Sequence, residues 1–267
     1  MLYIADLVGK PGRVMFKYHL KKIKERFAPD VVIVNGENAS HGFGLSVKNA
    51  KELINAGVQL FTGGNHSWDK KDILPLLDEL PVLRPLNYPK AAPGKGIAYM
   101  DVGGETLVVI NLMGHYTMPM VDNPFTMIVD EVQRLNEEGY RNIFIDFHAE
   151  ATSEKRALLA ILKGKVSAIC GSHTHIGTDD LVIDGDTFYV TDVGLTGCRD
   201  NVIGMDTKQP IDRFLTSISG KFDVPNQCKK ILQGVIFEIE EGKCIDAFKI
   251  KAYDENEIKV TQKAYKE

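Results

Sequence analysis

Short apolar segments alternate with helical patterns along the first two thirds of the sequence, and this alternation constrains the fold more than any other feature. Apolar runs predict strands at Leu2 to Ile4, Val31 to Val34, Gln59 to Thr62, Leu107 to Leu112, Asn142 to Asp146, Ala168 to Cys170 and Thr187 to Val190. Helices are expected between them, at about Val14 to Phe27, Val47 to Ala56, Lys70 to Leu80, Pro124 to Glu138 and Ser153 to Lys163. This rhythm is typical of βαβ units and predicts an α/β fold.

The pattern changes after Leu181, where two β-hairpins are expected. "LVIDGDTFYV" places two short strands around Asp184-Gly185, and "GVIFEIEEGKCIDAFKI" repeats the arrangement around Glu241-Gly242. Residue pairs of this kind favour tight hairpin turns. The sequence contains no internal repeat and no Pro/Ser linker, so we predict a single domain over residues 1–267.

Charge and hydrophobic content exclude some classes of function. With 267 residues and 44% hydrophobic content, the chain can bury a large core. The 32 basic and 36 acidic residues nearly balance, which argues against a duplex nucleic acid partner but leaves room for a small anionic ligand. No apolar run approaches the ~18 residues needed to span a bilayer, and the N-terminus lacks the pattern of a signal peptide. We therefore expect a cytoplasmic protein with no membrane partner.

The four cysteines are far apart in the sequence. Cys170, Cys198, Cys228 and Cys244 form no C-x-x-C pair, which argues against a zinc knuckle and a dithiol redox centre. Free thiols in a reducing cytosol are the expected state of all four.

Polar side chains of the kinds that bind metals stand at the carboxyl ends of five predicted strands. Ligands of α/β proteins bind beyond these ends, so residues far apart in sequence are expected to converge there. The set is Asp6, Glu37, Asn38, Asn65, His66, His148, His173 and His175.

Each of these residues has an ordinary interpretation when it is taken alone. A lone Asp after a strand is more often a turn residue, and His148 alone suits a hydrogen-bonded core histidine. "HTH" is more informative, because alternate residues of an extended chain point the same way. As a set, the carboxylate, amide and imidazole groups suit Mn, Fe or Zn better than Ca, and they suffice for two ions. A carboxylate shared by two ions is suited to displacement at phosphorus.

In this order, "ADLVG", "NGENA", "GGNHSWD", "DFHAE" and "GSHTHIG" resemble the blocks of the calcineurin-like metallophosphoesterases over residues 6 to 175. Two departures from the usual pattern stand out: Val8 replaces a metal-binding His, and Glu37-Asn38 replace the bridging Asp. Together with "VGKPGR" and "GENASHGFG", these departures resemble the YmdB subfamily of bacterial phosphodiesterases.

The resemblance implies a sandwich of two mixed β-sheets flanked by helices, and a two-metal phosphodiesterase acting on 2′,3′-cyclic and 3′,5′-cyclic nucleotides. One metal would be held by Asp6, Glu37, Asn38 and His175, and the other by Glu37, Asn65, His148 and His173. Glu37 would bridge them, and Asn38 would replace the ligand that Val8 cannot provide. Fe or Mn is favoured over Zn as the metal.

The expected mechanism is hydrolysis by a hydroxide that bridges the two ions. By resemblance to the Gly-Asn-His block, His66 would be the general acid that protonates the departing oxygen; the alternative is a structural histidine. Lys10, Arg13 and His115 also carry groups that could reach a phosphate, without a motif that assigns them to one. The other residues of the substrate site are unassigned.

Other functions stay open from the sequence. A phosphomonoesterase or a metal-dependent nuclease could use the same centre, and a weakly catalytic regulator could retain metal and nucleotide binding. The sequence does not identify the physiological substrate, and it leaves open whether the protein forms a homo-oligomer.

Overall fold

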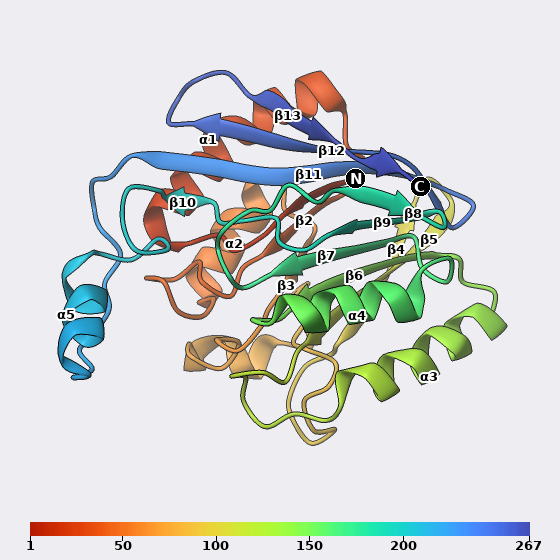
Figure 1. Cartoon of the computed structure of the whole chain (residues 1–267), viewed down its shortest axis with the longest axis horizontal. Helices are drawn as coiled ribbons and strands as arrows, with labels where there is room; N and C mark the ends of the chain where they lie inside the picture. The colour runs from red at the N-terminus through yellow and green to blue at the C-terminus, as the bar shows by residue number, and fades with distance from the viewer.

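Two mixed β-sheets of seven strands each pack face to face, with helices on their outer faces (Figure 1). The computed structural model describes residues 1–267. This arrangement confirms the predicted α/β sandwich.

The first sheet begins with three parallel strands, β1 (Leu2–Ile4), β2 (Val32–Asn35) and β3 (Leu60–Thr62). Its order is β13-β12-β11-β1-β2-β3, and β10 pairs with β11. Antiparallel neighbours complete it: β10 (Gly197–Cys198), β11 (Lys230–Glu240), β12 (Lys243–Tyr253) and β13 (Lys259–Lys263).

The second sheet has the order β14-β8-β9-β7-β6-β5-β4. Its parallel centre consists of β5 (Glu105–Met113), β6 (Asn142–His148), β7 (Ala168–Ser172) and β9 (Thr187–Val190). The remaining strands are β4 (Ile97–Val102), β8 (Val182–Asp184) and β14 (Tyr265–Lys266).

Apolar side chains form three layers of core. Helices α1 (Gly9–Phe27) and α2 (Val47–Ala56) pack on the first sheet, and α3 (Pro124–Glu137) and α4 (Thr152–Leu162) pack on the second. Aromatic and aliphatic side chains of both sheets fill the layer between them, including Tyr3, Phe144, Phe188 and Phe237. Burial on both faces explains the nearly continuous apolar runs of the central strands.

Local signals set several helix ends. The Ser46 hydroxyl accepts from the backbone N–H of Asn49, and Gly57 ends the helix with a φ of 116°, so α2 has the predicted limits. Helix α1 begins at Gly9, earlier than expected, because Pro11 is tolerated in a first turn.

The helix predicted over Lys70 to Leu80 is wrong. Only a short 3₁₀ helix, η1 (Lys71–Leu76), forms there, and Pro75 lies inside it. Proline removes a backbone donor and disfavours a continuous α-helix. The structure also adds β4, β10, β13, β14 and a last helix, α5 (Lys208–Thr216), which the apolar pattern did not predict.

Both predicted hairpins are present. Gly185 and Asp186 join β8 to β9 with φ values of 56° and 67°, and Glu241 and Gly242 join β11 to β12 with φ values of 48° and 85°. Two successive positive φ values match the twist of the flanking strands.

The expectation of four free thiols is wrong for two of the cysteines. Cys198 and Cys228 form a disulfide with a Cα–Cα distance of 5.6 Å, whereas Cys170 and Cys244 are free and buried. The bond joins residues 30 apart in sequence that folding brings together, a proximity that their spacing does not reveal. No helix has the length and apolar character needed to cross a membrane.

Lys249 predicts a pH dependence of stability. Its side chain is buried, its Nζ donates to the carbonyl oxygen of Thr178 at 3.0 Å, and burial lowers the pKa of Lys249 to about 8. Between this pKa and the ordinary value of 10.5, the unfolded chain binds more protons, so this group makes stability rise with pH. From pH 7.5 to 9.5 we expect the free energy of unfolding to rise by about 2 kcal/mol.

Denaturant unfolding of wild type and Lys249→Met at both pH values tests this prediction. The difference between the two proteins isolates the lysine, because every other titrating group is shared. An equal pH response in both proteins would assign the effect elsewhere.

Candidate metal centre

The predicted ligands gather where the carboxyl ends of strands from both sheets meet. Asp6, Glu37 with Asn38, and Asn65 follow strands of the first sheet, whereas His148 ends β6 and His173 follows β7 in the second. Asp6, Glu37, Asn38 and His148 are buried, which is unusual for polar groups without special partners.

Three side chains converge closely on His148. Its Nε2 lies 2.9 Å from Asn65 Oδ1, 3.1 Å from His173 Nδ1 and 3.1 Å from Glu37 Oε1. Ligand atoms of Glu37, His148 and His173 all lie within 4.8 Å of one another. The structure thus brings together the whole set predicted for one metal.

The residues predicted for the other metal lie beside this cluster. Asn38 Nδ2 is 3.2 Å from both Glu37 Oε1 and His175 Nε2, so the amide points into the site. A 180° turn of this amide presents its oxygen in the same place, as a cation requires. Asp6 Oδ1 lies 3.8 Å from His175 Nε2 and is buried with no hydrogen-bond partner.

Val8 is outside the cluster. Its buried side chain packs with Leu195 and Ile231 in a small apolar group. The position where the common pattern has a histidine therefore serves packing in this chain.

Partners of the three imidazoles select which ring nitrogen faces the cluster. Ser172 Oγ donates to Asp146 at 2.7 Å and accepts from His148 Nδ1 at 3.0 Å, which turns His148 Nε2 toward the cluster. Glu150 lies 3.1 Å from His173 Nε2, and the carbonyl of Ile203 lies 2.7 Å from His175 Nδ1. Such outer partners fix the tautomer of a metal-binding histidine.

The expectation that "HTH" is extended, with both histidines pointing the same way, is wrong, although both histidines reach the site. His173 has a φ of 98° and His175 a φ of 66°, so the backbone is not extended here. The two rings consequently join different sets, His173 with His148 and His175 with Asn38. Asp6 also has a positive φ, of 41°, and such strain clusters at functional sites.

Burial and mutual charge shift the pKa values of this cluster. Burial raises the pKa of Asp6 to about 6. Burial acts to lower the pKa of His148, but the Glu37 carboxylate outweighs it and raises that pKa to about 9. Burial acts to raise the pKa of Glu37, but His148 outweighs it and holds that pKa well below its ordinary value. Burial and then the charge of His148 lower the pKa of His173 to about 3, which keeps it neutral.

These observations fit a metal-binding site. Carboxylate, amide and imidazole donors match Mn, Fe or Zn, and neutral His173 is in the protonation state that a ligand needs. The unpartnered Oδ1 of buried Asp6 is an acceptor that only a cation or donor can satisfy.

Gly64 leaves room for the cluster. A Cβ at this position would lie 2.2 Å from Glu37 Oε2 and 2.3 Å from His148 Cδ2. We expect Gly64→Ala to lose bound metal, because these two side chains must move apart. Metal analysis of the purified variant measures the effect.

Gly103→Ala is the matched control, because a Cβ there meets nothing within 4 Å. The φ of Gly103 is 63°, so this change costs about 1 kcal/mol of stability and leaves metal content intact. Full metal content in the Gly64 variant would contradict the prediction.

A cavity of about 520 Å³ opens over the cluster, and His66 lies on its wall. His66 Nδ1 is 2.9 Å from Asp69 Oδ2, and its ring meets Phe43 edge-on at 4.9 Å between centroids. The backbone N–H of His66 donates to Glu37 Oε2 at 3.1 Å. His66 thus lies beside the proposed bridge with its ring held by a carboxylate.

Three residues that the sequence left open lie away from the cavity. Arg13 donates to the carbonyl of Ala39 at 2.5 Å and to Glu52 at 3.1 Å, and Lys10 is exposed. His115 Nε2 faces the carbonyl oxygens of Val121 and Asp122 at 3.2 and 3.1 Å. None of the three lines the cavity.

Sequence reasoning missed several residues of the site. Asp69 and Glu150 each follow a predicted site histidine by two or three positions, a signal that was present in "NHSWD" and "HAE". Asp146 and Ser172 lie within strands and gave no signal, because only the pairing of β6 with β7 brings them together.

The sandwich and its cluster define a metallophosphoesterase fold. A family model described as "YmdB-like protein" matches residues 2–250, and the chain belongs to that family. This confirms the resemblance found in the sequence.

Relatives cover nearly the whole chain. A 2′,3′-cyclic-nucleotide 2′-phosphodiesterase of Bacillus subtilis (strain 168) is 44% identical over 243 residues, which are 90% of this chain and 91% of that protein. A hypothetical protein from Thermus thermophilus has a TM-score of 0.89 and 38% identity, covering 95% of this chain and 98% of its own. A novel phosphatase from Mycoplasma pneumoniae has a TM-score of 0.89 and 33% identity, covering 94% and 92%.

Proposed function

We propose that this protein is a metal-dependent phosphodiesterase that hydrolyses 2′,3′-cyclic nucleotides. The name of the Bacillus subtilis relative supports the substrate class. The observation that carries the chemistry is the convergence of Asn65, His173 and Glu37 on His148 Nε2 at 2.9 to 3.1 Å.

Two ions would be held by the predicted sets. Asp6, Glu37, Asn38 and His175 would hold one, Glu37, Asn65, His148 and His173 would hold the other, and Glu37 would be shared. When bound, the ions would activate water and offset the charge of the phosphoryl oxygens. Fe and Mn are the proposed metals, with Zn as a third candidate.

In the reaction, water adds to phosphorus, the bond from phosphorus to the 2′ oxygen breaks, and a nucleoside 3′-monophosphate forms. His66 would deliver the proton that the 2′ oxygen takes up. Asp69 would hold the ring through Nδ1 and so leave Nε2 as the proton carrier. Ser172 and Asp146 would keep the His148 ring in place.

Several broader assignments belong to the same proposal. Residues 1–267 would form one domain, and the protein would act in the cytoplasm without a duplex nucleic acid or membrane partner. Hydrolysis of 3′,5′-cyclic nucleotides and assembly into a homo-oligomer are further predictions.

A metal-resolved activity screen tests the function. Protein purified without chelators is loaded with Mn, Fe or Zn and assayed on 2′,3′-cyclic and 3′,5′-cyclic nucleotides, nucleoside monophosphates and short RNA. We expect the 2′,3′-cyclic substrates to be cleaved fastest. Faster cleavage of monoesters or RNA would favour a phosphomonoesterase or nuclease, and failure of every loaded form on an activated diester would favour a binding regulator.

A further inference from the structure

The cavity over the candidate metal centre has two unlike walls. One wall carries the polar cluster, including Glu37, Asn38, His173 and His175. The other comes from the segment between Cys198 and Cys228, which we call the roof segment (residues 199–227). Its residues on the cavity are Val202, Ile203, Met205, Pro210, Arg213, Phe214 and Phe222.

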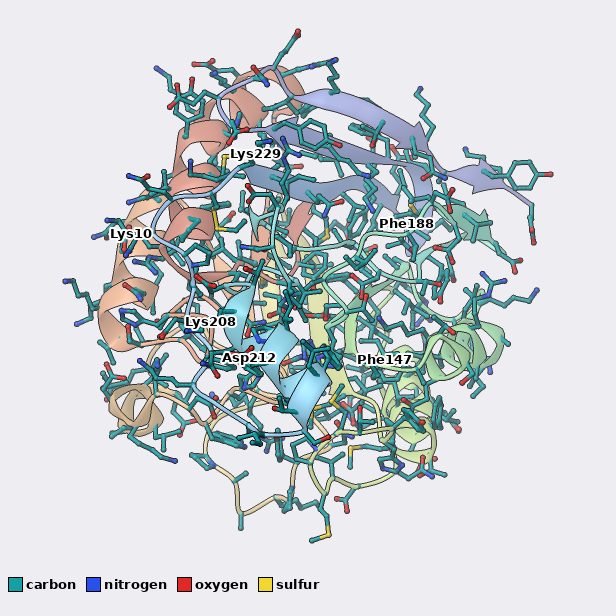
Figure 2. The ribbon with its side chains drawn as sticks, turned by 60° about the vertical axis from the view of Figure 1, so that its left-hand side comes forward. Lys10, Phe147, Phe188, Lys208, Asp212 and Lys229 are labelled. Carbon is teal, nitrogen blue, oxygen red and sulfur yellow. A yellow bond between two sulfur atoms is a disulfide. The ribbon has the colours of Figure 1, made fainter.

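A disulfide closes the roof segment, and several of its residues contact the site or the loop beside it. The Cys198–Cys228 disulfide joins its two ends. Met205 packs so closely on the loop before α2 that a Cβ at Gly42 would lie 2.5 Å from Met205 Cε, and the carbonyl of Ile203 contacts His175 Nδ1 at 2.7 Å. Helix α5, with Lys208 and Asp212 labelled, stands in front of the sandwich in Figure 2.

Arg213 is a cation without an anionic partner. It is the only arginine or lysine on the cavity wall, and it forms no ion pair, even with the adjacent Asp212. Its guanidinium lies over the ring of Phe222, with Cζ 5.8 Å from the ring centroid. Such a stacked guanidinium keeps its planar N–H donors available for a ligand.

Aromatic rings accompany this cation at the mouth of the cavity. Phe214 lines the cavity and is 83% exposed, so this large apolar side chain packs against little of the protein. Phe222 is half-buried and faces the cavity. Nucleobases are flat and apolar on their faces and polar at their edges, so aromatic rings and arginine are the groups that bind them.

We propose that Arg213, Phe214 and Phe222 form the subsite for the nucleobase of the substrate. The base stacks on the phenylalanine rings, and Arg213 donates hydrogen bonds to acceptors on its edge. The phosphate end of the same molecule would then lie at the candidate metal centre. This inference rests on the proposed function, because it assigns the second half of the same substrate.

Two cyclic phosphates with and without a base test the subsite. Guanosine 2′,3′-cyclic phosphate and glycerol 1,2-cyclic phosphate share the five-membered ring that is opened, and only the first carries a base. We expect Phe222→Ala and Arg213→Ala each to lower kcat/KM for the guanosine substrate about 10- to 100-fold. Both variants should cleave the glycerol substrate at the rate of wild type.

Lys208→Ala and Leu215→Ala are the matched controls. They lie on α5, are exposed as Arg213 and Phe214 are, and do not line the cavity. They should match wild type on both substrates. An equal loss on both substrates in the Arg213 and Phe222 variants, or no loss at all, would overturn the subsite.

Binding of guanosine 3′-monophosphate to the metal-loaded protein, followed by calorimetry, separates this inference from the proposed function. If wild type cleaved neither cyclic phosphate, the proposed function would fail. The subsite would still stand if wild type bound the guanosine nucleotide at least 10-fold more tightly than glycerol phosphate and the Arg213→Ala and Phe222→Ala variants lost that difference. Equal binding of the two probes by wild type would overturn it.

Discussion

Glu37→Gln is expected to lose at least one bound metal per chain and more than ~100-fold in kcat/KM. The change keeps the shape of the side chain and removes the charge that the two proposed ligand sets share. Replacing even an outer partner of a metal ligand typically lowers metal affinity or activity about 10- to 100-fold. Replacing a bridging ligand should therefore lower them more. Glu37 is buried and contacts both His148 and the backbone N–H of His66, so its carboxylate is held in one position between them.

Metal analysis and kinetics on the same preparation measure both effects. Glu79→Gln, an exposed substitution of the same kind in the segment after η1, is the control and should match wild type. Alanine at Asn65 or His148 should likewise lose metal and activity together. A Glu37→Gln protein with full metal content and full activity would remove the bridge from the proposal.

His66→Ala is expected to lower kcat by about 10² to 10⁴ while leaving metal content intact. The imidazole lies on the cavity wall and its ring bonds to Asp69 rather than to a proposed metal ligand, so its loss should affect proton delivery alone. The fall should shrink on a diester with a good leaving group, which departs without a proton. Asp69→Asn should give a smaller fall, because it leaves the ring in place and weakens only its orientation.

The role of His66 is decided by how the fall in kcat of His66→Ala depends on the leaving group. A metal-replete His66→Ala protein that turned over a poor leaving group at the wild-type rate would make His66 a structural residue. Equal losses on good and poor leaving groups would indicate that His66 positions the substrate.

Asn38 shows how a departure from the common pattern is accommodated. Val8 is buried among Leu195 and Ile231, and its side chain carries no atom that could bind a metal. Asn38 lies one residue after the proposed bridge, and its amide contacts both Glu37 and His175. An additional amide donor thus stands beside the ligand set that lacks the histidine.

Secondary structure was predictable where burial and local caps agree. The central strands are apolar because both of their faces are covered, and α2 carries a Ser cap and a Gly stop. Prediction was wrong at Lys70 to Leu80, where Pro75 interrupts the helix, and it missed α5, whose apolar side chains are largely exposed. Only Pro210 of α5 is buried, so this helix contributes little to the core.

The order of residues along the chain determined by itself which chemical groups stand at strand ends, since strands end where apolar runs end. Carboxylate, amide and imidazole groups at five such ends were sufficient to indicate a metal site. The resemblance already implied how they divide into two sets, and the tertiary structure supplies the physical reason, because His173 and His175 turn apart at positive φ and contact different partners. Long-range packing also decided the Cys198–Cys228 bond and the placement of Arg213 over the cavity, since neither depends on neighbours in sequence.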